Sequence, residues 1–175
     1  MQEFAKRPVT IEEFEKEKTQ DGAICELIDG IVMMSRPSID HQKILTNLSG
    51  ELYQYFKGKT CKNFSEIEIK LNNDILVPDI SIICDFAKSL DQRYDGAPTI
   101  SIEILSPSTM FNDFNIKSNK YMIAGVKEYW IVDHKSQTVI INDFVNKAMT
   151  TFEKVDVLKS NIFEDLKIKL EDIFE

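Results

Sequence analysis

The chain has 175 residues, of which 43% are hydrophobic and 29% are charged, and its formal net charge at pH 7 is −8. This length suits one well-buried domain over residues 1–175 and is too short for two ordinary domains. The acidic balance argues against a broad nucleic-acid-binding surface, but it is compatible with a narrow basic groove.

No apolar run is long enough to span a membrane, and the first seven residues lack the apolar core of a signal peptide. The three cysteines, Cys25, Cys61 and Cys84, are odd in number and far apart, and they form no Cys-x-x-Cys pair. We therefore expect neither a disulfide framework nor a zinc site, and we expect a cytoplasmic protein in a reducing compartment.

Local patterns predict the elements of the first part of the chain. These are a helix over 11–18 opened by a capping box, strands 24–28 and 31–34 around an Asp-Gly turn, and a helix after Pro37-Ser38 that runs to about residue 56. Next come a strand over 67–71, a polar turn, and a second apolar strand over 75–84. A loop is expected over 91–98.

The second part is expected to contain a central strand followed by a helix. The expected elements are a strand over 99–105, apolar on both faces, a helix from about 113 to 124 that ends at Gly125, strands 129–132 and 138–144, a further strand near 152–155, and an apolar tail from 166 that packs on the sheet.

Two acidic residues stand out within these apolar strands. Glu103 lies inside an apolar strand, where an unpaired carboxylate is costly to bury, and Pro78-Asp79 is expected to end a similar strand. Because side chains alternate between faces, Asp79 shares a face with Ser81, and Glu103 shares a face with Ser101. Two carboxylates on adjacent strands are a candidate site for a hard divalent cation, and this polar face is the expected cleft. Alternatively, each acid ends its strand and points to solvent.

Several motifs occur together in a fixed order. They are Cys-Glu-Leu-Ile-Asp-Gly over 25–30, Pro37 with His41-Gln42, Pro78-Asp79-Ile80, Glu-Ile-Leu-Ser-Pro-Ser-Thr over 103–109, then Asp113, Lys117 and Tyr121, and the block 125–133. In order and spacing they resemble the Uma-two-type restriction-endonuclease-like family of the PD-(D/E)XK nuclease superfamily, over about residues 8–174. The resemblance implies an α/β fold, a restriction-endonuclease-like mixed β-sheet flanked by helices, with a nuclease site that uses Mg²⁺ or Mn²⁺.

The resemblance also implies roles for single residues. Asp79 and Glu103 match the metal-binding acids, and Glu26 matches an early acid that completes the catalytic set. The superfamily lysine usually lies two residues after the second acid, where this chain has Leu105. Lys117 on the following helix matches the lysine that the family carries there, and it would polarise the phosphate or hold the attacking water. The alternatives are a solvated Lys117 and an exposed Glu26 in the hairpin.

Three further residues are candidates for substrate binding: His41, Lys120 and Tyr121. His41 either contacts phosphate at the rim of the cleft or is a partly buried histidine at the edge of the core. Asp113, Lys117, Lys120 and Tyr121 lie at spacings that share one helix face, so a packed helix could aim them at the site. Asp113 would then orient Lys117 through an i, i+4 pair.

These expectations describe a metal-dependent endonuclease that acts on nucleic acid, and we expect the nucleic acid to be DNA. A homodimer is compatible with this hypothesis. One departure weakens this hypothesis. The chain has no arginine over 110–115, where family members often carry them, and phosphate affinity rests mainly on Lys and Arg. Phe111 and Phe114 could stack on the bases of a single strand, lie in the core or form a dimer contact.

The alternative hypothesis is an inactive relative that binds nucleic acid or protein. The retained acids and Lys117 favour an enzyme, whereas the acidic charge favours the binding module. Two converging carboxylates without a cation would also repel each other. The sequence alone therefore predicts that Asp79→Asn melts higher than the wild type when metal is chelated.

Overall fold

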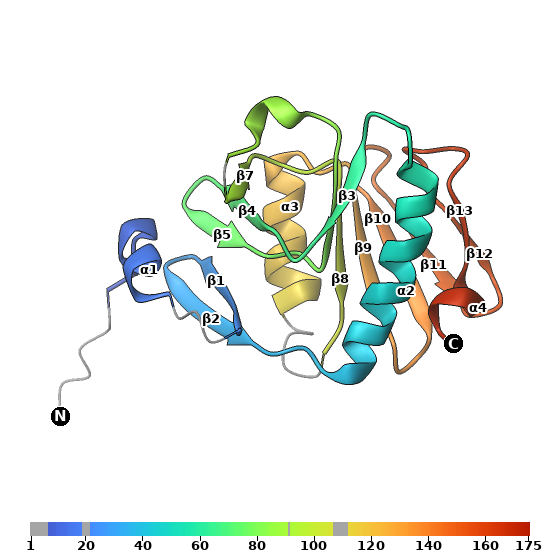
Figure 1. Cartoon of the computed structure of the whole chain (residues 1–175), viewed down its shortest axis with the longest axis horizontal. Coiled ribbons are helices and arrows are strands. Elements are labelled where there is room, and N and C mark those ends of the chain that lie inside the picture. Colours follow the sequence, from blue (N-terminus) through green and yellow to red (C-terminus); the bar gives the residue numbers. More distant parts are fainter. Residues whose placement is uncertain (1–6, 19–21, 91, 107–111) are drawn as a thin grey trace.

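A computed structural model describes residues 7–18, 22–90, 92–106 and 112–175 (Figure 1). The elements of the first half are α1 (Ile11–Glu17), β1 (Ile24–Ile28), β2 (Ile31–Ser35), α2 (Ile39–Phe56), β3 (Lys62–Ser65), β4 (Glu68–Leu71), β5 (Asp74–Leu76), β6 (Ile80–Ile83), the 3-10 helix η1 (Phe86–Lys88) and β7 (Arg93–Asp95). The second half contains β8 (Ile100–Ile104), the π-helix η2 (Asn112–Lys117), α3 (Ser118–Ala124), β9 (Glu128–Asp133), β10 (Thr138–Asp143), β11 (Ala148–Glu153), β12 (Val157–Lys159), β13 (Lys167–Lys169) and α4 (Leu170–Ile173).

The strands form two larger sheets and one small one. The order in the first sheet is β2-β1-β5-β4-β7, the order in the second is β11-β10-β9-β8-β6-β3, and β12 pairs with β13. The pairs β8–β9 and β4–β7 are parallel and the others are antiparallel. A parallel pair needs a long crossover, and η2 with α3 supplies it between β8 and β9. The predicted mixed sheet with flanking helices is therefore confirmed.

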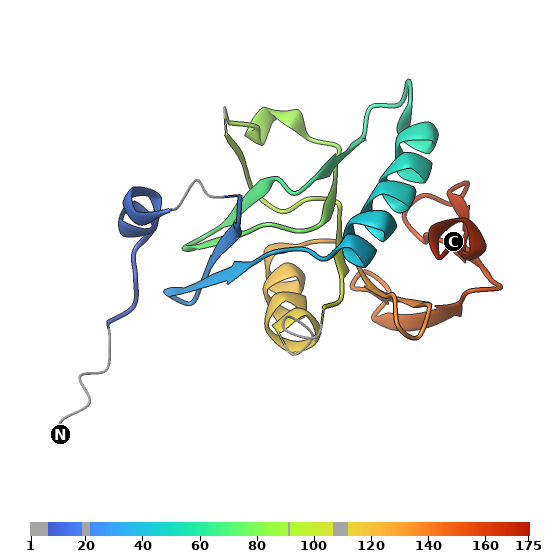
Figure 2. The same cartoon turned by 60° about the horizontal axis from the view of Figure 1, so that its bottom comes forward.

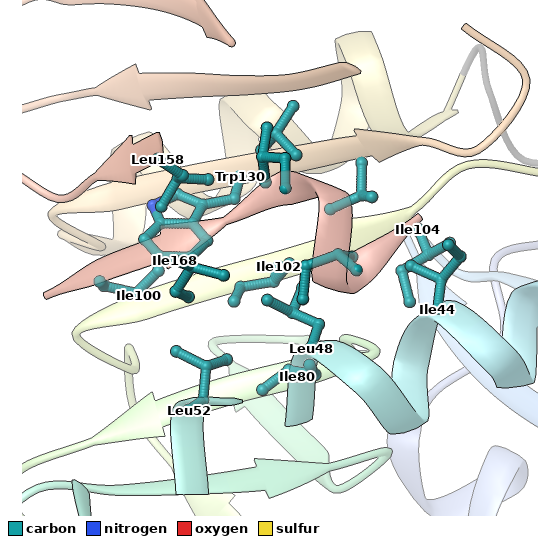
Figure 3. Packing of buried hydrophobic residues seen from close by; sticks show 14 of the residues in the cluster. Ile44, Leu48, Leu52, Ile80, Ile100, Ile102, Ile104, Trp130, Leu158 and Ile168 are labelled. Carbon is teal, nitrogen blue, oxygen red and sulfur yellow. The ribbon is translucent and has the colours of Figure 1, made fainter. Parts of the chain in front are cut away.

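Helix α2 covers one face of the six-stranded sheet. Its N-terminus is capped by Ser38, whose hydroxyl accepts a hydrogen bond from the backbone N–H of His41 at 3.2 Å. Below this cap, Leu48 packs in the same buried cluster as Ile102 of β8 and Trp130 of β9 (Figure 3). The chain end from Leu166 onward also joins this cluster, which confirms that the apolar tail packs back on the sheet.

Helix α3 lies on the other face of β8. Figure 2 shows α3 in yellow and α2 in cyan on either side of this strand. The buried side chains between α3 and the sheet include Tyr121, Tyr129 and Leu105. Ser81 and Ser101 are paired across β6 and β8 and are both fully buried. The polar face expected to form the cleft does carry the pocket, but only at the end with Asp79 and Glu103, because the two serines are buried and do not line it.

Two local predictions hold in detail. Thr10 and Glu13 form a reciprocal capping box at the start of α1. The Asp-Gly turn connects β1 and β2, and Gly30 has a φ of 75°. A Cβ atom at Gly30 would lie 2.4 Å from the Cβ of Pro8, so glycine is required there by both conformation and space.

The predicted strand over 75–84 is wrong in one respect, because it is two strands that belong to different sheets. Strand β5 ends at Leu76 and β6 begins at Ile80. Pro78 has no N–H for a sheet ladder, and the chain changes sheets around it. Asp79 therefore lies immediately before a strand instead of ending one. The loop expected over 91–98 also contains β7, and β3 and β12 were not predicted.

The expectation that the cysteines remain reduced is also wrong. Cys61 and Cys84 form a disulfide with a Cα–Cα distance of 4.1 Å, whereas Cys25 is free and buried. Strands β3 and β6 pair Lys62 with Ile83, so the two cysteines face each other at the next position of the ladder. Spacing along the chain could not reveal this register. The inference of a reducing compartment thus loses the support of the cysteines.

Glu128 forms a buried polar link between β9 and the chain after β12. Its Oε2 atom accepts hydrogen bonds from Trp130 Nε1 and Ser160 Oγ, both at 2.9 Å, and its Oε1 atom accepts one from the Asn161 N–H at 2.7 Å. Glu128 is fully buried, so these three donors replace the water that a carboxylate would otherwise need. Within the described ranges, no helix is both long and apolar enough to cross a membrane.

Candidate active site

A small pocket opens where the two larger sheets meet. Its volume is about 40 Å³, and it is lined by Ile24, Glu26, Ser35, Arg36, Pro37, His41, Val77, Asp79, Glu103, Ile104, Ser106, Asp113 and Lys117. Four carboxylates thus meet from four separate segments: β1, the start of β6, β8 and η2. A pocket of this size has room for an ion or a few water molecules, but not for a nucleotide.

Asp79 and Glu103 lie on neighbouring strands, as predicted. The pairs Ser81–Ser101 and Ile80–Ile102 set the antiparallel register, and its continuation places Asp79 opposite Glu103. The Oδ2 atom of Asp79 accepts a 2.6 Å hydrogen bond from the backbone N–H of Ile104. This bond ties the carboxylate to the end of β8. Asp79 and Glu103 are 6% and 4% exposed, so neither points freely into solvent.

Glu103 is buried and contacts two side chains of the crossover segment. Its Oε1 atom lies 3.1 Å from Nζ of Lys117 and accepts a 2.9 Å hydrogen bond from the hydroxyl of Tyr121. Burial raises the pKa of the Glu103 carboxyl well above its ordinary value, although the charge of Lys117 opposes this rise. Neighbouring carboxyls, Asp113 first among them, raise this pKa further.

Lys117 is the cation at the centre of the carboxylates. Its ammonium lies 2.9 Å from Oε1 of Glu26 and 3.4 Å from Oδ1 of Asp113, in addition to Glu103. The same Glu26 oxygen accepts a 2.8 Å hydrogen bond from the backbone N–H of Val77. Burial alone would lower the pKa of Lys117, but these three carboxylates outweigh it, so the pKa is raised well above its ordinary value. Lys117 is therefore charged.

His41 faces Asp79 rather than the solvent. Its Nε2 atom lies 3.0 Å from Oδ1 of Asp79, and its side chain is 8% exposed. Burial lowers the pKa of His41, but its hydrogen bond to Asp79 and the charge of this residue raise it more, so the net shift is upward. Among the described residues, the buried Nδ1 atom has no hydrogen-bond partner. This geometry makes His41 a support for Asp79.

The structure thus gathers six of the eight sequence-predicted residues in one pocket, namely Glu26, His41, Asp79, Glu103, Asp113 and Lys117, and leaves Tyr121 and Lys120 outside its lining. Tyr121 is fully buried and touches Glu103, so it orients this acid instead of meeting substrate. Lys120 points away from the pocket, where its ammonium contacts Asp29 and lies 2.8 Å from Asp74. The expected substrate contact of Lys120 has no support in this geometry.

Arg36 is a pocket residue that the sequence reasoning missed. It is exposed, lines the pocket and precedes Pro37, which the motifs had already singled out. Its position next to the Pro37 motif is the sequence signal that points to it, whereas the search for arginines was made only in the segment before Lys117. Within that segment, Phe114 is 39% exposed, which argues against a place in the core. Phe111 and the motif residues 107–109 lie outside the described residues.

The donor chemistry of the pocket suits a hard divalent cation, because Glu26, Asp79 and Glu103 all offer carboxylate oxygens. The arrangement is not preassembled for one. Across residues 7–18, 22–90, 92–106 and 112–175, no three His, Cys, Asp or Glu side chains are positioned to hold a metal ion. The ammonium of Lys117 instead contacts two of these three acids.

Comparison with known proteins shows the family to which this chain belongs. No curated protein matches the chain. Among solved structures, the chain is similar to one described as a "putative nuclease belonging to DUF820", from Anabaena variabilis ATCC 29413. The TM-score is 0.82 at 22% identity, with 95% of this chain and 98% of the other covered, which establishes a shared fold. The model of the family Uma2, described as "Putative restriction endonuclease", matches residues 11–171. Because this match spans most of the sequence, the chain belongs to the Uma2 family.

Proposed function

We propose that this protein is a metal-dependent nuclease that hydrolyses phosphodiester bonds of nucleic acid, with DNA as the expected substrate. The observation that carries the proposal is the convergence of Glu26, Asp79, Glu103 and Lys117 in one pocket. Three buried carboxylates and a buried lysine are an expensive combination for a fold to maintain unless the groups have a use. The family description points to the same chemistry.

In this proposal Asp79 and Glu103 hold Mg²⁺ or Mn²⁺, and Glu26 completes the set of oxygen ligands. When bound, the cation supplies positive charge that stabilises the phosphate in the transition state and acidifies the attacking water. His41 holds Asp79 in place through its Nε2 atom, and Tyr121 holds Glu103 through its hydroxyl. Fixed ligand orientations of this kind are what a metal site needs from its surroundings.

In this proposal the cationic side chains of Lys117 and Arg36 bind the substrate. Lys117 has three N–H donors and no acceptor, so it acts on a phosphate oxygen or the attacking water, and not on a cation. Arg36 is exposed at the pocket and is suited to a second phosphate, because its planar guanidinium can donate two parallel hydrogen bonds. It would supply part of the phosphate affinity that the segment before Lys117 lacks.

Cleavage of labelled double-stranded DNA, single-stranded DNA and RNA with Mg²⁺ or Mn²⁺ tests the proposal. Asp79→Ala and Glu103→Ala should each abolish cleavage while circular dichroism shows a retained fold. Asp74→Ala is the matched control, because Asp74 is 7% exposed and contacts a lysine, but lies outside the pocket. Full activity in either pocket variant would remove the assignment.

A folded wild type that binds nucleic acid or protein but cleaves none of the three substrates would favour the inactive binding module. The position of Lys117 among the acids and the net charge of −8 are the observations that keep this second candidate open.

A further inference from the structure

Lys117 occupies the oxygen atoms that a metal ion would need. Its ammonium lies 2.9 Å from Oε1 of Glu26 and 3.1 Å from Oε1 of Glu103, and the side chain is 5% exposed. Both acids belong to the ligand set of the proposed function. An ammonium and a divalent cation are both positive and would share these oxygens, so they cannot occupy the same position together.

The cluster also needs a cation when no metal is bound. Glu26, Glu103 and Asp113 are each less than 9% exposed, and uncompensated carboxylates in such an environment repel one another and lose hydration. Lys117 is the lysine whose ammonium contacts all three. It therefore holds these acids together in the structure described here.

We propose that Lys117 is a built-in competitor for the metal, an inference that rests on the proposed nuclease function. In the metal-free protein it neutralises the acid cluster and occupies the oxygen atoms of Glu26 and Glu103. A divalent cation displaces its ammonium from Glu26 and Glu103 toward the mouth of the pocket, where it meets the phosphate of the substrate. Binding of the metal ion would then also move Lys117 into the position from which it acts on the substrate.

Helix α3 is held by side-chain contacts, whereas the Lys117 side chain is long and flexible. Lys117 is the last residue of the π-helix η2, a rare helix type that is frequently found at functional sites. The following helix α3 is fixed by Tyr121 on Glu103 and by Lys120 on Asp74. The lysine stem has four flexible carbons, so a change of side-chain rotamer is enough to move the ammonium. The pocket, at about 40 Å³, is too small for a nucleotide, so the ammonium meets a phosphate only by moving outward.

Lys117→Met tests the inference, because methionine keeps an unbranched apolar stem and removes the charge. Mn²⁺ binding to the full chain is measured by titration calorimetry after treatment with chelator, and melting is followed with chelator and with Mn²⁺. We expect the variant to bind Mn²⁺ at least tenfold more tightly than the wild type. Its melting temperature should be lower than that of the wild type in chelator and should rise more with Mn²⁺. Lys120→Met, one turn along the helix, should keep the affinity of the wild type.

A second measurement uses the wild type and needs no folded variant. A buried ammonium exchanges its protons slowly, so the ¹⁵N NMR spectrum of lysine side chains should contain a protected signal from Lys117. Diamagnetic Mg²⁺ should remove this protection by moving the ammonium to solvent. A signal that stays protected when Mg²⁺ saturates the protein would overturn the inference.

The outcomes separate the inference from the function. If the wild type binds Mn²⁺ through Glu103, as shown by loss of binding in Glu103→Ala, but Lys117→Met binds no more tightly, the competitor role is wrong and the metal-dependent nuclease stands. If neither the wild type nor Lys117→Met binds Mn²⁺ or Mg²⁺, the metal-dependent function itself is refuted, and the competitor role with it.

Discussion

Replacement of Asp79 by asparagine shows whether this carboxylate is stabilised by its partners or strained by its neighbours. Its Oδ1 atom lies 3.0 Å from Nε2 of His41, and its Oδ2 atom accepts a 2.6 Å hydrogen bond from the N–H of Ile104. Asparagine has one oxygen, so its amide NH₂ must face one of these partners. We expect Asp79→Asn to melt lower than the wild type in chelator, the opposite of what the sequence alone predicts.

The magnitude follows from the contacts. A hydrogen bond to a charged group contributes about 1.5–3 kcal/mol, and Asp79 is too buried for water to replace it. Relief of repulsion from Glu103 offsets part of this loss, but only a small part, because Lys117 already compensates Glu103. A net loss of about 1–2 kcal/mol lowers the melting temperature of a chain of this length by about 2–8 °C.

The assay is a double-mutant cycle in chelator with Asp79→Asn, His41→Ala and the double variant. Residues in direct contact are expected to show a coupling of about 0.5–3 kcal/mol. Asp74→Asn paired with His41→Ala is the control and should show no coupling, because Asp74 contacts Lys120 instead. A higher melting temperature for Asp79→Asn, or a cycle without coupling, would refute the reasoning.

Three further predictions concern turnover and stability. Lys117→Ala should lower turnover by about a hundred- to a thousandfold, the usual effect of losing one electrostatic stabiliser, whereas Lys120→Ala should change it little; steady-state cleavage rates decide between them. Glu128→Gln turns an acceptor of three hydrogen bonds into a group that also donates, so urea denaturation should show a loss of about 2–3 kcal/mol. Reduction of the Cys61–Cys84 disulfide should lower the free energy of unfolding by about 3 kcal/mol, since the bond closes a loop with a sequence separation of 23. A thiol titration in denaturant that finds all cysteines free before reduction would contradict the last of these.

The local elements of this protein follow from its sequence because their causes are local. The capping box at Thr10, the turn at Gly30 and the left-handed C-cap at Gly125 each depend on residues a few positions apart. The burial of Glu103 was also predictable, since its strand is apolar on both faces. These features were predicted from neighbours along the chain, and they hold in the structure.

What the tertiary structure alone decided was the pairing of distant groups. Glu26 and Lys117 are far apart in sequence, yet they meet because β1 of one sheet and η2, which follows β8 of the other sheet, line the same pocket. The bond between Cys61 and Cys84 and the contact between His41 and Asp79 likewise depend on strand register and helix placement. Strand register and packing depend on many weak contacts between distant parts of the core, so they cannot be predicted from any single segment of the chain.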